Sequence, residues 1–150
     1  MKATLLPLLA FALLFSGCGK DDTPPPAPLT HHLEARVTGT DLTGMAATVD
    51  VWRDYPFLDR LYLEALPTSV GKTIDLGTYG NNARVSGIIR FFAVAPSSSV
   101  EPRSTTALQL ELLADGRVIE TTVLNQAKTG FQVSTSPVLA GQAFIETAKL

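Results

Sequence analysis

Histidine is the side chain most often used as the base in nucleophilic catalysis, and this chain has two, His31 and His32. They are adjacent, so in an extended chain their rings point to opposite sides. We expect a solvated entrance to the folded domain at this point. Weak capture of a metal ion by the pair is the alternative.

Paired carboxylates are the other common catalytic arrangement, because two of them can supply an acid and a nucleophile for glycoside hydrolysis. Asp50, Asp54, Asp59 and Glu64 lie close together in the sequence, but no spacing among them marks such a pair. The chain also lacks the Asp-x-Asp-x-Asp-Gly pattern of a calcium loop. We therefore expect no enzyme, no catalytic residue, no metal and no cofactor.

The segment 52–60 combines aromatic rings with Asp and Arg side chains. Trp52 shares strand parity with Asp50 and Asp54, which predicts a ring outside the core, and Tyr55 and Phe57 follow around Pro56. Exposed rings beside charges suit the faces of a sugar or serve as anchors at a protein interface. Trp52, Tyr55 and Phe57 are thus candidate ligand-binding residues. The alternative is a Trp52 packed between sheets or under the loop.

The only cysteine, Cys18, stands at the end of an apolar leader. Lys2 supplies a positive charge, 5–15 form an apolar run too short to cross a bilayer, and Ser16-Gly17 are the small residues that a signal peptidase requires. The stretch Phe15-Ser16-Gly17-Cys18 resembles the lipobox of bacterial lipoproteins, which prefer Leu where Phe15 stands. The resemblance implies cleavage before Cys18 and lipidation of its sulfur and amino group, hence stable attachment to a membrane.

Three charged residues follow the cysteine closely. Lys20-Asp21-Asp22 resembles the surface-export signal of lipoproteins in the Bacteroidota, which implies an outer-membrane protein that faces the cell exterior. The alternative is a merely solvated tether and a domain on the periplasmic face. The prolines of 23–28 predict a stiff spacer, and at about 3.1 Å per residue 19–30 can hold the domain roughly 35 Å from the lipid.

The sequence therefore divides into a signal peptide (1–17), a lipidated cysteine with its Pro-rich tether (18–30) and a single domain (31–150). Within the domain, short segments alternate apolar and polar residues at period two, which predicts strands. We expect them at 33–37, 48–54, 61–66, 73–78, 83–95, 108–112, 118–124, 131–134 and 143–148.

Two segments carry more specific signals. Residues 83–95 are apolar on both faces, which predicts a central strand, with a β-bulge at Gly87. Asp115-Gly116 between two alternating segments predicts a tight hairpin. Strand number and turn spacing favour an all-β fold, a two-sheet antiparallel β-sandwich of immunoglobulin-like or transthyretin-like kind. The alternative is an eight-stranded, lipocalin-like β-barrel, which the breaks at Pro56, Pro67, Pro96 and Pro137 disfavour.

The net charge of the chain limits the classes of partner that it is expected to bind. Without the leader, which contains Lys2 as its one charged residue, 11 basic and 14 acidic residues remain, a net charge of −3 that argues against nucleic acid. We expect a non-catalytic binding or accessory module, held to the membrane through lipid on Cys18, with an extracellular glycan or protein as ligand. The alternatives are a structural subunit of a cell-envelope assembly and a carrier of a small apolar ligand.

Overall fold

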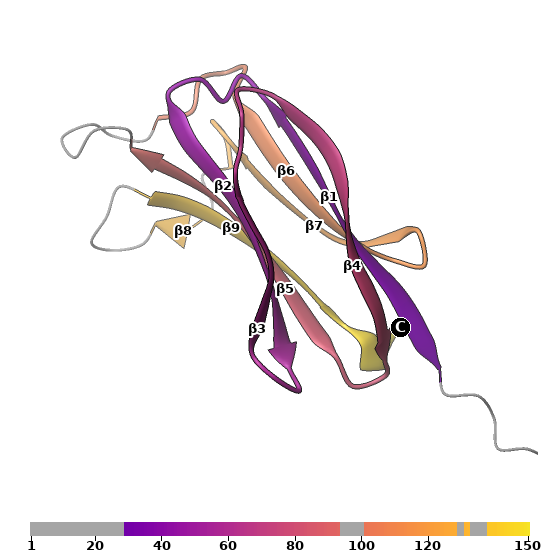
Figure 1. Ribbon diagram of the computed structural model, residues 1–150. Helices are drawn as coiled ribbons and strands as arrows, with labels where there is room; N and C mark the ends of the chain where they lie inside the picture. The colour runs from indigo at the N-terminus through magenta and orange to yellow at the C-terminus, as the bar shows by residue number, and fades with distance from the viewer. Residues whose placement is uncertain (1–28, 94–100, 129–130, 133–137) are drawn as a thin grey trace, which may run out of the picture.

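The computed structural model describes residues 29–93, 101–128, 131–132 and 138–150 (Figure 1). The predicted signal peptide, Cys18, the predicted export signal and the tether up to residue 28 lie outside these residues. The described part of the chain forms nine strands and one short 3-10 helix. They are β1 (Thr30–Thr40), β2 (Met45–Tyr55), β3 (Asp59–Ala65), β4 (Val70–Gly80), β5 (Arg84–Ala93), β6 (Ala107–Ala114), β7 (Arg117–Asn125), β8 (Phe131–Gln132), β9 (Val138–Glu146) and η1 (Thr147–Lys149).

The strands form two sheets that face one another (Figure 1). One has the order β4-β1-β6-β7 and the other β3-β2-β5-β9-β8, and every pairing between neighbours is antiparallel. The prediction of an all-β, two-sheet antiparallel sandwich is confirmed. The alternative of a closed eight-stranded barrel is wrong, because in the described residues the strands belong to two separate sheets.

The strand order is not that of an immunoglobulin domain, in which the first strand pairs with the second. Here β1 pairs with β4 and β6, and β2 lies in the other sheet. The predicted central strand is confirmed, since β5 lies between β2 and β9.

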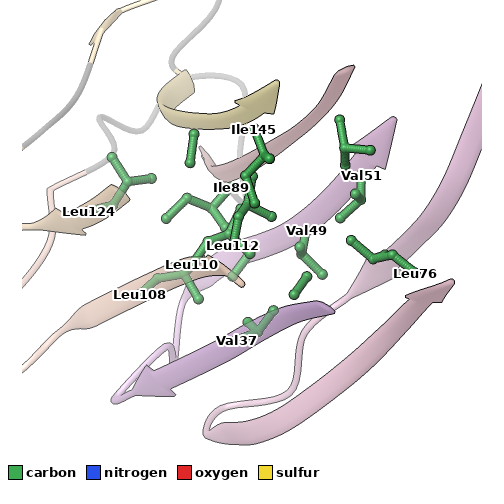
Figure 2. Packing of buried hydrophobic residues seen from close by; sticks show 14 of the residues in the cluster. Val37, Val49, Val51, Leu76, Ile89, Leu108, Leu110, Leu112, Leu124 and Ile145 are labelled. Atoms are coloured by element: carbon green, nitrogen blue, oxygen red, sulfur yellow. The ribbon is translucent and has the colours of Figure 1, made fainter. Parts of the chain in front are cut away.

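The core fills the space between the two inner faces, which the alternating apolar residues supply (Figure 2). Val37 from β1 and Leu108, Leu110 and Leu112 from β6 meet Val49 from β2 and the apolar residues of β5 and β9. These labelled side chains of β1, β2 and β6 are fully buried. At about 25 cal/mol per Å² of apolar surface, this layer is the main source of stability that the described residues offer.

Gly87 is a regular strand position of β5. The predicted bulge there is wrong, because Gly87 pairs regularly with Val51 on one side and Ala143 on the other. Its inward position explains the glycine, since a Cβ would lie 2.5 Å from Leu110 Cδ2. The missing side chain makes room for a leucine from the opposite sheet.

The Asp115-Gly116 turn is confirmed as a tight hairpin between β6 and β7. Both residues have positive φ, 51° and 76°, as a type I′ turn requires. The last strand begins earlier than expected, at Val138 rather than 143. Gly141 is an inward strand position whose Cβ would lie 2.5 Å from Thr122 Oγ1 of the opposite sheet.

Because all pairings are antiparallel, each turn between strands lies at one or the other end of the sandwich (Figure 1). We call one of them the tether end, because the chain enters β1 there. It contains the start of β1 at 29–30, the turns at 56–58, 81–83 and 115–116, and the C-terminal residues 147–150.

Candidate functional site

A row of side chains crosses the outer face of the five-stranded sheet near its tether end. The pairing places Arg60 of β3 opposite Trp52 of β2, Trp52 opposite Ser86 of β5, and Ser86 opposite Phe144 of β9. Adjacent strands are about 4.8 Å apart, so the two rings stand roughly 10 Å from one another, on either side of a serine. We call these four residues the aromatic row.

Trp52 forms the first aromatic–arginine pair of this row. The Arg60 guanidinium carbon lies 4.3 Å from the centre of the indole ring, a cation–π distance. The ring is half-buried and is not part of the core cluster, so the predicted position outside the core is confirmed and packing between the sheets is wrong. The surface presents a ring together with a cation.

A β-bulge creates this pair. The β2–β3 register shifts between Val51 and Trp52, so that Val51 opposes Tyr62 and Trp52 opposes Arg60. Without the shift, Leu61 would face Trp52; instead Leu61 packs against the core. Bulges commonly re-aim side chains in this way beside functional sites.

Phe144 and Arg84 form the second pair. The Arg84 guanidinium carbon lies 4.8 Å from the phenyl ring, and Phe144 is 45% exposed. Asp54 holds the arginine with a 3.7 Å ion pair and accepts a 3.1 Å hydrogen bond from the Ser86 hydroxyl. A second register shift, between Arg53 and Tyr55, leaves Asp54 without a partner residue on β5.

Phe144 and Arg84 were not predicted from the sequence as site residues. The available signal was parity, since Phe144 alternates with the apolar Ala143 and Ile145 and so belongs on the outer face. Parity alone does not show which outward residues of distant strands are neighbours.

Asp50 lies under the row, buried to 4% exposure between two arginines. Arg60 Nε is 3.2 Å from one carboxylate oxygen and Arg90 Nη1 is 3.3 Å from the other. A buried carboxylate needs such partners, because burial removes its water. Among the described residues, two guanidinium groups contact this one carboxylate, so these three groups together carry one net positive charge, which attracts acidic groups.

The other carboxylates that were weighed for hydrolysis also have basic partners. Asp59 pairs with Arg53 at 3.1 Å, and Glu64 contacts Lys72 across the two edge strands, next to Tyr62. Each of the four carboxylates is thus placed in an ion pair of its own. This arrangement suits a structural role better than an acid and a nucleophile that share one substrate.

Phe57 does not join the row. Phe57 is 72% exposed on the β2–β3 turn at the tether end, beside Leu58 at 74%. Tyr55 is the last residue of β2, and its side chain is outside the described part. The structure therefore separates Trp52, on the sheet face, from Phe57, at the tip of the same hairpin.

An open hollow of about 500 Å³ borders the second pair. Asp54, Arg84 and Glu146 supply its charged groups, and the 81–83 turn and Ala148 supply the rest of its lining. Lys149 donates a hydrogen bond to Glu146 and thereby lowers the pKa of that carboxyl. The hollow could take one side chain or one sugar ring of a larger ligand.

The two histidines have separate partners. His31 Nδ1 is 2.8 Å from Asp115 Oδ2, and His32 Nε2 is 3.6 Å from Asp75 Oδ1. The hydrogen bond from the His31 ring, and then the one from the His32 backbone N–H, lower the pKa of Asp115. In the described residues no three His, Cys, Asp or Glu side chains gather as a metal site would require.

Comparisons with protein families, curated proteins and solved structures find no match to this chain. In the part of the chain that the structure describes, no helix is both long and apolar enough to cross a membrane.

Proposed function

We propose that the protein is a lipid-anchored outer-membrane lipoprotein whose β-sandwich is a non-catalytic module for binding a protein. Anchoring on Cys18 and export through Lys20-Asp21-Asp22 rest on their resemblance to lipoprotein signals. The observation that carries the binding role is the aromatic row, with Arg60 on Trp52 and Arg84 on Phe144.

The composition of the row favours a protein over a glycan. Arg and aromatic residues are enriched in the energetically dominant centres of protein interfaces. Each ring of the row has a guanidinium over one face, so the surface offers a cation together with each ring. The cationic surplus at Asp50, Arg60 and Arg90 fits a partner with acidic side chains beside its apolar contact.

Crosslinking in living cells tests the binding role. A photoreactive benzoylphenylalanine in place of Phe144 should give a discrete protein adduct, and one in place of the exposed Thr121 of β7 should give none. Arg60→Ala should weaken the adduct at least about tenfold, since central arginines are frequent hot spots. Arg36→Ala is the matched control, because Arg36 is equally exposed and paired on the other sheet.

Three outcomes would contradict the proposal. Equal adducts at Phe144 and Thr121 would mean that the row has no special role. A protease-resistant adduct that periodate degrades would identify a glycan as the ligand. An adduct insensitive to Arg60→Ala would remove the row from the contact.

Export is tested separately by protease treatment of intact cells. The native domain should be digested, and a variant with Lys20, Asp21 and Asp22 changed to Ala should be protected. If both are protected, the domain faces the periplasm and the partner is an envelope protein on that side.

A further inference from the structure

Large apolar side chains are exposed mainly at the tether end. In the described residues, Leu63 is exposed away from this end, and Phe144 is exposed in the row near it. The remainder lie on the two chain ends, on the β2–β3 turn and just after the β6–β7 turn: Leu29, Leu150, Phe57, Leu58, Val118 and Ile119. At the opposite end, the turn residue Leu42 is buried to 2% exposure.

Phe57 and Leu58 project furthest into solvent of these residues. They are consecutive, more than 70% exposed, and follow Pro56, which ends β2. Directly behind them the Arg53–Asp59 ion pair of 3.1 Å joins the two strands of the hairpin. The hairpin therefore presents both side chains on a braced tip rather than folding them back onto the sheet.

We infer that this tip docks the tether end on the lipid surface to which the chain is anchored. The inference rests on the proposed lipid anchor at Cys18. The tether enters β1 at this same end, and its length limits the distance to the lipid to roughly 35 Å. Because the link is covalent, contact of the tip with the lipid is an intramolecular step, which favours even weak partitioning of two apolar side chains once the tether leans toward the surface.

The charges around the tip permit this contact. Asp59 is paired with Arg53, Asp54 with Arg84, and Glu146 with Lys149. No carboxylate of these three meets an anionic lipid headgroup without a neighbouring cation. The position of the tip at the tether end favours lipid as its partner, because a protein could bind an apolar tip at either end of the sandwich.

Docking of the tip would fix the orientation of the sandwich on the membrane. With the tip on the lipid, the strands stand away from the surface, and both outer sheet faces point sideways. The aromatic row would then lie close above the membrane, where it can reach a neighbouring membrane protein.

The test uses the lipidated full chain in vesicles of phosphatidylethanolamine and phosphatidylglycerol that contain nitroxide headgroup lipid. Lipid occupies the native Cys18, so an introduced cysteine is the sole reactive thiol. A fluorescent thiol probe is placed at Asn82→Cys, an exposed position in the 81–83 turn of the tether end, or at Ser69→Cys, exposed at the opposite end. Both positions leave Phe57 and Leu58 intact.

We expect nitroxide lipid to quench the Asn82 probe at least about fivefold more than the Ser69 probe. Adding Phe57→Ser and Leu58→Ser should abolish the difference, and because both side chains are exposed the fold should survive. Equal, weak quenching of both probes in protein that floats with the vesicles would overturn docking and leave the anchor standing.

Two further outcomes also decide the matter. Protein that fails to float with the vesicles lacks the anchor, and docking through it fails as well. An Asn82 probe that is shielded from both lipid and aqueous quenchers, more so at higher protein density, would show that a second copy covers the tether end instead.

Discussion

The two outward faces of the sandwich differ in the side chains that they present. On the four-stranded sheet, the pairing aligns Arg36 with Thr73 and Glu111, and Thr38 with Gly71 and Gln109. On the five-stranded sheet, the corresponding rows contain Trp52 and Phe144, with arginines stacked on both. The rows of the first face are what a solvated antiparallel sheet requires, and its exposed Val118 and Ile119 lie near the β6–β7 turn. The rows of the second face carry more apolar surface than solvation needs.

The difference shows at which positions the fold does not dictate the type of side chain. Both inner faces must be apolar to form the core, so the stability of the fold is enough to explain their residues. An outer face needs only to be compatible with water. Rings and arginines concentrated on one of the two faces therefore indicate a use for that face.

The largest expected effect is a loss of stability in the inner layer. It is the reference for the smaller effects expected on the two outer faces. Leu110→Ala removes a fully buried side chain that fills the space beside Gly87. The free energy of unfolding in urea should fall by about 2–5 kcal/mol. A loss below about 1 kcal/mol would mean that the inner layer is not the main source of stability.

The next effect compares the ion pairs on the two outer faces. Asp50→Asn removes a buried charge between two arginines and should cost about 2 kcal/mol of unfolding free energy. Glu111→Gln, which breaks the 3.0 Å pair with Arg36 on the other face, should cost less than about 1 kcal/mol. Equal costs in urea denaturation would contradict the special status of the Asp50 cluster.

Trp52→Ala compares stability with binding at the row. The half-buried ring and its cation–π contact should contribute about 1 kcal/mol to stability, whereas the crosslink at Phe144 should be lost. Thr121→Ala on the other face should change neither. A stability loss as large as that of Leu110→Ala would reassign Trp52 to the core.

The smallest effect is a pH dependence at the tether end of the four-stranded sheet. The folded-state pKa of Asp115 is depressed by its hydrogen bonds from His31 and His32. The contribution of Asp115 to the free energy of unfolding is therefore fully present when the pH is above the ordinary pKa of 3.8. It is lost as the pH falls through the lower folded-state pKa. The stability difference from Asp115→Asn should shrink on acidification from neutral pH; a constant difference would contradict this.

Several features of the fold could be predicted from local pattern. Alternation located the strands, Asp115-Gly116 the β6–β7 hairpin, and the apolar segment after Ala83 the central strand. Parity placed Trp52 outside the core. The bulge predicted at Gly87 was wrong, because a glycine that accommodates a side chain from the opposite sheet looks the same in sequence as one that permits a bulge.

The site itself was only partly predictable. Trp52 was predicted and Arg60 lies in the predicted segment 52–60, whereas Arg84 and Phe144 were not predicted. The bulge that sets Arg60 rather than Leu61 opposite Trp52 has no marker in the sequence.

The sequence by itself determined which residues face inward and which face outward, because alternation along a strand is a local property of extended backbone. It also contains the segments from which the membrane anchor is proposed. Only the tertiary structure decided that Arg60, Trp52, Ser86 and Phe144 form one row, and that Asp50 lies between Arg60 and Arg90. Strand order, register and bulges join residues far apart in the chain, and the packing of the whole sandwich selects them.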